Sequence, residues 1–194
     1  RYLEMLRFQN AIYPENFVKL RYVENHDQER IMKTAPSREQ ALAWTAFCAF
    51  NSGAFLVYGG QESAAAHTPS LFDVDRVVWK NYKFSEFIST MARLKKDPAQ
   101  VEGQFTITGA EPAITAIWEY PGNHLVGVFN VCKNKGKVSV ALPDGTYENI
   151  LDQKPVMVKD GSVGIPDIAL VLRAPSLTEE VRPFYTDLLD LPIG

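Results

Sequence analysis

The chain has 194 residues, 46% of them apolar, and it carries a net charge of −3 with an isoelectric point near 5.7. A chain of this length and composition can bury a large core, so we expect one large globular domain or two small ones. The acidic balance, without any run of five like charges, argues against nucleic acid or an anionic membrane as the main partner.

Residues 1–14, RYLEMLRFQNAIYP, form the first predicted element. Leu3, Leu6 and Ile12 recur at near-helical spacing and the pattern stops at Pro14, which predicts a helix. The amphipathic pattern is already under way at the first residue, so we expect this helix to begin before residue 1. No signal peptide opens these residues, and the sequence leaves the localisation open.

Two predicted strands each end in polar residues. FVKLRYV, residues 17–23, alternates Val18, Leu20 and Tyr22 and runs into ENHD. AFLVYGG, residues 54–60, is a compact apolar run that predicts a strand buried on both faces, and Gln61 and Glu62 follow it. We therefore expect both strands to deliver polar groups at their C-terminal ends.

Helices are predicted between and after these strands. Ser37 and Gln40 form a capping box before the helical stretch 41–50, and apolar residues at helical spacing predict another helix over 82–96, after a long loop. The apolar stretch 41–60 is interrupted at 51–53, so we interpret it as helix and strand, not as a membrane span. The alternation over 1–96 indicates parallel strands with crossover helices, as in a βα-barrel or an open α/β sheet.

From Asp97 the apolar period changes to two, in runs such as QFTIT, HLVGVFNV, KVSVAL and PVMVK. Turn residues separate these runs at 121–123, 143–145 and 160–161. We expect a separate domain over 97–174, an antiparallel β-sandwich of about seven or eight short strands. In the tail, 175–194, the apolar residues Phe184, Leu188 and Leu189 are compatible with a short helix.

Several of these stretches resemble the C-terminal half of α-amylase family glycoside hydrolases, which are (β/α)8-barrel (TIM-barrel) enzymes that act on α-glucans. ENHD followed by Arg30 resembles the motif of the seventh barrel strand, and LVYGGQE resembles that of the eighth. FDVDRVVW is similar to the following loop, and LVGVFN and LPDGTYENIL are similar to parts of the family's C-terminal sandwich. The resemblance implies that residues 1–96 are the C-terminal portion of such a barrel.

The resemblance also implies roles for individual residues. Asp27 matches the carboxylate that stabilises the oxocarbenium-like transition state, His26 matches an imidazole that binds the sugar beside the cleaved bond, and Asn25 matches the amide before it. Glu62 is similar to an acidic residue at the rim of the site. Trp79 and Phe72 lie in the loop after the eighth strand, on the face where barrel sites form, and from this position we hypothesise that they stack on a sugar ring.

The family's nucleophile and acid/base are not matched by any residue in this sequence. A retaining glycosidase needs two carboxyl groups about 5–5.5 Å apart, and a third such as Asp27 assists them without replacing them. In the family those two groups follow the fourth and fifth strands, and no G-x-R-x-D pattern occurs here. We therefore expect a parent enzyme, a glycosidase or transglycosidase acting on α-glucosidic linkages, and no activity from the 194 residues alone.

Other interpretations stay open. Glu24, His26, Asp27 and Glu29 have the character of a solvated strand end, and their spacing matches no standard zinc site. Glu62 has a structural alternative, a cap or an arginine partner. Two alternative functions are open for the whole chain. It is either a non-catalytic barrel scaffold or a protein whose sandwich binds carbohydrate.

The remaining expectations concern partners and isolated side chains. We predict an α-glucan or oligosaccharide substrate, the N-terminal half of the barrel as partner, and self-association through exposed barrel surfaces. No metal site or cofactor is predicted in this chain, and calcium or chloride elsewhere stays open. Cys48 and Cys132 are interpreted as buried free thiols, His67 and His124 as surface residues, and Trp44 and Phe47 as core residues.

Overall fold

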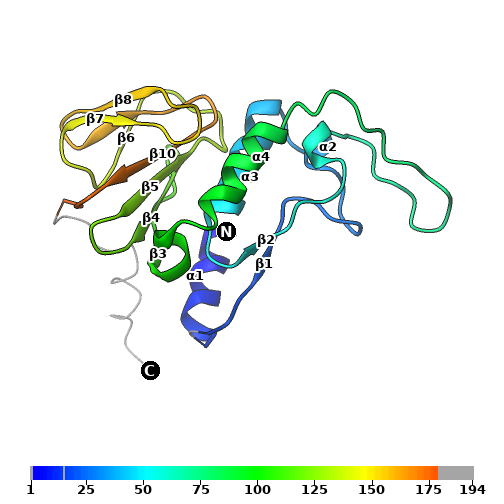
Figure 1. Ribbon diagram of the computed structural model, residues 1–194, viewed down its shortest axis with the longest axis horizontal. Helices are drawn as coiled ribbons and strands as arrows, with labels where there is room; N and C mark the ends of the chain where they lie inside the picture. Colours follow the sequence, from blue (N-terminus) through cyan, green and yellow to red (C-terminus); the bar gives the residue numbers. More distant parts are fainter. Residues whose placement is uncertain (1, 15, 179–194) are drawn as a thin grey trace.

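The structure, a computed structural model, describes residues 2–14 and 16–178, and its first part consists of helices, two short strands and a long loop (Figure 1). In chain order these elements are α1 (Tyr2–Ile12), β1 (Leu20–Arg21), α2 (Ile31–Thr34), α3 (Arg38–Phe50), β2 (Ala54–Phe55), the 3-10 helix η1 (Gln61–Ser63), α4 (Ser85–Leu94) and α5 (Pro98–Glu102). The three predicted helices are confirmed, with α4 shorter than expected at both ends.

Helix α3 begins as the capping box predicts. Ser37 has an extended backbone, and its Oγ accepts a hydrogen bond from the Gln40 amide at 3.2 Å and donates one to Gln40 Oε1 at 3.2 Å. These bonds satisfy groups that the first helical turn leaves unpaired. From Ala41 to Phe50 nearly every side chain is buried, so α3 is the central helix of the fold.

Within the described residues, eight strands follow α5, in agreement with the seven or eight expected. They are β3 (Gln104–Gly109), β4 (Ile114–Glu119), β5 (His124–Phe129), β6 (Lys137–Ser139), β7 (Gly145–Glu148), β8 (Pro155–Val158), β9 (Ser162–Gly164) and β10 (Ala169–Ala174). Four of them form an antiparallel sheet in the order β10-β5-β4-β3, and β6-β9 and β7-β8 are antiparallel pairs. This arrangement is compatible with the predicted β-sandwich.

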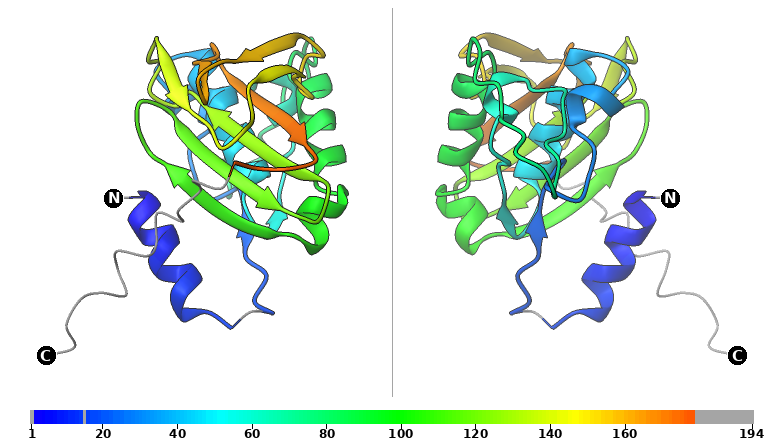
Figure 2. Two further views of the ribbon diagram at one scale, coloured as in Figure 1. Left: turned by 90° about the vertical axis from the view of Figure 1, so that its left-hand side faces the viewer. Right: turned by 90° about the vertical axis from the view of Figure 1, so that its right-hand side faces the viewer.

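The four-stranded sheet is covered on both faces. One face packs on α3 and α4 through Phe47, Phe50 and Met91, and the other packs on the short strand pairs through Val138 and Val158. Figure 1 shows the sheet between these two layers, and Figure 2 shows α1 projecting beyond it. Because both faces are covered, β4, β5 and β10 are buried almost continuously and do not simply alternate.

The two strands predicted in the first part are much shorter than expected. β1 covers two residues of the stretch 17–23, and β2 covers two residues of 54–60. Val57 is 40% exposed, so the expectation that 54–60 is buried on both faces is wrong. The physical reason is that, among the described strands, β1 and β2 pair only with each other, so no further strand lengthens them or shields Val57.

The turn of helix α5, capped by the Asp97 side chain on the Ala99 amide at 3.0 Å, precedes the first sandwich strand and was not predicted. Cys48 is buried as expected, but Cys132 is exposed because it follows β5 in a surface turn. The apolar residues predicted for a tail helix lie outside the described residues. Within those residues, no helix is long and apolar enough to cross a membrane.

Candidate functional site

The two short strands bring two polar loops to one edge. β1 and β2 run parallel, with Leu20 opposite Ala54 and Arg21 opposite Phe55. Parallel strands end at the same edge, so the loop that begins at Glu24 and the loop that begins at Tyr58 leave side by side. The sequence prediction of two neighbouring polar strand ends is confirmed in this respect.

A buried ion pair holds the base of the first loop. Arg30 Nη1 donates to Glu24 Oε1 at 2.7 Å, and both side chains are completely buried. The second oxygen, Glu24 Oε2, accepts a hydrogen bond from the Ile31 amide at 2.7 Å. Both carboxylate oxygens are thus engaged, which is the condition under which a buried charge is tolerated. The alternative interpretation, in which Glu24 is part of a solvated strand end, is therefore wrong for this residue.

Arg30 also reaches the second loop and the segment after it. Its Nη2 donates to the Gly59 carbonyl at 2.8 Å, and its Nε donates to the His67 carbonyl at 3.1 Å. Its guanidinium lies 4.2 Å from the centre of the Tyr58 ring, a cation–π distance. A single planar cation therefore joins three segments of the chain.

Between Glu24 and Arg30 the chain makes a turn that carries the predicted sugar-binding triplet. The half-buried Asn25 accepts the Asp27 amide on its Oδ1 at 2.9 Å, and the Gln28 amide bonds the Asn25 carbonyl at 3.3 Å. The side chains of His26 and Asp27 are 63% and 62% exposed, with His26 Nε2 3.3 Å from Asp27 Oδ2. The imidazole and the carboxylate thus share one open surface, where they can accept and donate hydrogen bonds to a ligand.

The second loop holds Glu62 in a local structural contact. Glu62 Oε2 accepts the Gly60 amide at 3.0 Å, and the Glu62 carbonyl accepts the Phe84 amide at 2.9 Å. Gly60 has φ +97°, and a Cβ there would lie 2.7 Å from Val77 Cγ1 and 3.3 Å from Arg30 Nη2. The capping alternative for Glu62 thus has direct contacts, and the residue is half-buried.

The two aromatic candidates differ in their surroundings. A Cβ on Gly59 would lie 3.6 Å from Trp79 Cη2, so the indole lies against the bare backbone of the second loop. Trp79 is 49% exposed, whereas Phe72 is 94% exposed at the outer end of the loop. Of the two predicted platforms, Trp79 is thus the one that lies against another loop, whereas Phe72 is almost fully exposed.

The long loop between η1 and α4 is organised by Asp75. Its Oδ2 accepts the Ser70 amide at 2.9 Å and lies 2.7 Å from His67 Nε2. The Ser70 amide, and then His67, hold the pKa of Asp75 below its ordinary value. His67 is exposed as predicted. His124 was also predicted at the surface, but it is half-buried and its Nδ1 is enclosed.

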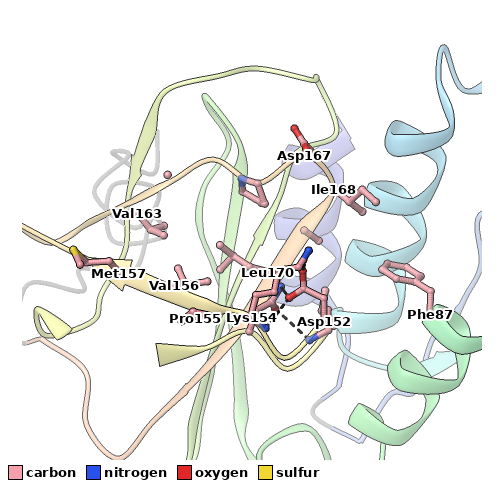
Figure 3. A pocket seen from close by; sticks show the side chains of 15 residues that line it. Phe87, Asp152, Lys154, Pro155, Val156, Met157, Val163, Asp167, Ile168 and Leu170 are labelled. Atoms are coloured by element: carbon pink, nitrogen blue, oxygen red, sulfur yellow. Dashed lines mark hydrogen bonds and ion pairs between the residues drawn. The ribbon is translucent and has the colours of Figure 1, made fainter. Parts of the chain in front are cut away.

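A hollow beside the sandwich lies apart from the candidate residues. A hollow of about 520 Å³ lies between the sandwich and α4, lined by Phe87, Val156 and Leu170 among others, and the candidate site residues do not line it (Figure 3). Among the described residues, no group of three His, Cys, Asp or Glu side chains is placed to hold a metal ion. The loops at the ends of β1 and β2 therefore remain the candidate site.

Sequence reasoning missed the importance of Glu24 and undervalued Arg30. The pair is six residues apart across a turn, and no periodicity in the sequence reveals that both side chains are buried. Glu29, by contrast, does point outward, bonding Thr68 at 3.1 Å and Lys33 at 2.9 Å. The available signal was an acid at the strand end followed by an arginine directly before a helix.

Comparisons with known proteins agree with the resemblance seen in the sequence. Residues 106–172 match the model of the family described as Bacterial Alpha amylase C-terminal domain. An alpha-amylase from Lactobacillus plantarum superposes with a TM-score of 0.80 and 28% identity, covering 89% of this chain and 42% of that one. No curated protein sequence matches this chain.

Two further solved structures share the fold at lower identity. The maltogenic alpha-amylase AmyB from Thermotoga neapolitana has a TM-score of 0.76 and 24% identity, covering 90% of this chain and 45% of that one. AmyP in complex with maltose has a TM-score of 0.69 and 17% identity, covering 92% and 45%. The chain thus spans less than half the length of these relatives. It is similar to the C-terminal part of α-amylase family glycoside hydrolases.

Proposed function

We propose that this chain is the C-terminal part of an α-amylase-type glycosidase or transglycosidase that acts on α-glucosidic linkages. In this proposal β1 and β2 are the seventh and eighth strands of a (β/α)8 barrel within residues 1–96. Residues 97–174 form the sandwich domain, and 175–194 form a tail. The observation that carries the proposal is the exposed turn bearing Asn25, His26 and Asp27 at the end of two parallel strands.

Asp27 is the residue that contributes to the chemistry. As positive charge develops at the anomeric carbon, a fixed carboxylate beside it lowers the energy of the transition state more than that of bound substrate. His26 and Asn25 bind hydroxyls of the same sugar, Glu62 lies at the rim, and Trp79 stacks on a neighbouring ring. The nucleophile and the acid/base come from the rest of the barrel, which is the partner of this chain.

Kinetics of the full-length protein on maltooligosaccharides test this assignment. Asp27→Asn keeps the size of the side chain and removes its charge, so kcat should fall by about 10²–10³-fold. Asp167→Asn, a matched change at an exposed aspartate on the sandwich, should leave kcat within about twofold. If both variants retain wild-type turnover, Asp27 has no catalytic role.

A second measurement separates the parent enzyme from the chain alone. The 194 residues by themselves should release no reducing sugar from maltooligosaccharides, because one assisting carboxylate cannot form and break the glycosyl–enzyme bond. Turnover that is lost in Asp27→Ala would contradict this. Starch binding by the sandwich without the first 96 residues would favour the carbohydrate-binding alternative.

A further inference from the structure

The side chain of Asp27 has little of its own to hold it in place. Asp27 Oδ2 lies 3.3 Å from His26 Nε2, and both side chains are more than half exposed. The position of the carboxylate is therefore set by the backbone of the turn. That backbone is held from inside by Asn25, which bonds the Asp27 amide, and at its two ends by Glu24 and Arg30.

The Glu24–Arg30 pair contacts both the turn that carries Asp27 and the second loop. Glu24 bonds Arg30 and the Ile31 amide, which closes the turn into a ring. Arg30 bonds the Gly59 carbonyl, against which Trp79 lies, and the His67 carbonyl. The same guanidinium thus fixes the turn of Asp27 relative to the loop of Glu62 and Trp79.

We infer that Glu24 and Arg30 are positioning residues that set the location of Asp27 relative to the second loop, an inference that rests on the proposed role of Asp27. Neither side chain reaches a ligand, because both are fully buried. They act by geometry, since displacement of a reacting group by about 1 Å can lower a rate by 10²-fold. The turn is mobile in solution without them and fixed with them.

The test compares two substitutions in the full-length protein. Arg30→Lys retains the positive charge, but a single ammonium cannot reach Glu24, Gly59 and His67 with the geometry of the planar guanidinium. Glu24→Gln retains the shape and removes the charge. At a temperature where circular dichroism shows the variants folded, each should lower kcat on maltooligosaccharides by about 10²-fold and change KM by less than about threefold.

The matched control is Lys33→Gln. Lys33 pairs with Glu29 at 2.9 Å on the exposed side of the same segment, so this variant also removes an ion pair near the turn. It should leave kcat within about twofold, as exposed pairs contribute little. Equal losses in Lys33→Gln and Arg30→Lys would overturn the inference.

A double-mutant cycle distinguishes positioning from general support of the fold. If Arg30 acts through Asp27, then Arg30→Lys should lower kcat by less than about threefold when Asp27 is already Asn. A full 10²-fold loss in both backgrounds would show that Arg30 acts independently of Asp27, and would overturn the inference.

Hydrogen exchange keeps the inference testable if the proposed function fails. In Arg30→Lys the amides of residues 25–28 and 59–61 should exchange faster together, while those of β4 and β5 remain unchanged. Unchanged exchange in either loop would show that Arg30 does not couple them. Wild-type inactivity on α-glucans, or full activity in Asp27→Asn, would instead refute the proposed function.

Discussion

The sandwich and the first 96 residues differ sharply in where their apolar side chains lie. In β4, β5 and β10 the apolar residues are covered on both faces by other parts of the chain. Among the described residues, the large apolar side chains left exposed after residue 96 are Val101 and Met157. The sandwich strands thus find their packing partners within the chain.

The first 96 residues leave an extended apolar surface open. It comprises one side of α1 and the chain up to Tyr22, where Phe8 is 64% exposed, Val18 is 70% exposed and Leu20 is 51% exposed. Large apolar side chains that stay exposed along one segment of a chain often mark an interface. In the proposed function its partner is the rest of the barrel. An apolar pattern therefore predicts that a side chain is buried in the complete protein. It does not predict which segment of the protein covers that side chain.

The largest expected effect comes from removing a ring that joins the sheet to the helices. Phe129 is fully buried, and its ring centre lies 5.4 Å from that of Phe47 and 5.2 Å from that of Phe50. Phe129→Ala should lower the free energy of unfolding by about 3–5 kcal/mol, because the cavity between sheet and α3 cannot close. Urea denaturation of the 194-residue chain measures this.

The matched change is Met157→Ala on the outside of the sandwich. Met157 is 68% exposed, so its truncation should change the free energy of unfolding by less than about 0.5 kcal/mol. Similar losses in the two variants would show that the joined core described here does not carry the stability.

The open apolar surface gives the second prediction. Val18 and Leu20 together expose enough apolar area that the isolated chain should self-associate, and Val18→Lys with Leu20→Lys should raise the dissociation constant at least about tenfold, or 1.4 kcal/mol. Light scattering at two concentrations tests this. The control is Val101→Lys with Met157→Lys, which should leave association unchanged. A wild-type chain that stays monomeric at both concentrations would contradict the prediction.

The sequence predicted the helices and the short strands after residue 97 well because their signals are local. Ser37 and Gln40 mark the start of α3, and the glycine-containing and proline-containing turns separate the short strands. It failed over residues 54–60, where a wholly apolar run implied two covered faces. Burial of that run depends on strands beside it, and a sequence window contains no information about them.

The candidate site was predictable in part, because its motifs are also local signals. Asn25, His26, Asp27 and Glu62 were identified through their motifs, and the parallel pairing of β1 with β2 brings their loops to one edge. Arg30 bonds carbonyls 29 and 37 residues away, and these contacts exist only once the chain has folded. Long-range bonds to backbone carbonyls leave no residue-type signal, so the coupling of the two loops was invisible.

A cluster of ionisable groups at the C-terminal end of α3 gives a pH-dependent prediction. Lys95 Nζ donates to the Asn51 carbonyl at 2.5 Å and Arg21 Nε donates to the Ser52 carbonyl at 3.0 Å, so both cations cap the end of α3. Burial lowers the pKa of Lys95 to about 8, and burial raises the pKa of the Cys48 thiol to about 12. The two shifts act in opposite directions on stability.

The sign follows from which state binds more protons. Between pH 8 and 9 the unfolded chain keeps the Lys95 proton that the folded chain loses, so stability should rise by about 1 kcal/mol. From about pH 8 upward the unfolded Cys48 begins to ionise while the folded thiol does not, so the net rise should be smaller in wild type than in Cys48→Ala. Urea denaturation at pH 7, 8 and 9 should show the rise in wild type and in Cys48→Ala, and lose it in Lys95→Met. A rise that persists in Lys95→Met would assign it to another group.

The smallest expected effect separates two aromatic side chains in the same loop. Trp79 lies against Gly59 and is already fixed, whereas Phe72 is 94% exposed and would have to be ordered by the ligand. Stacking on a ring that is already in place avoids the entropy cost of ordering a mobile side chain. Trp79→Ala in the full-length protein should therefore raise KM for maltooligosaccharides by about three- to tenfold. Phe72→Ala should raise KM by less than about twofold. Steady-state kinetics with both variants decides between them. Wild-type KM in Trp79→Ala would remove it from the site, and a larger effect in Phe72→Ala would mean that the loop closes over the substrate.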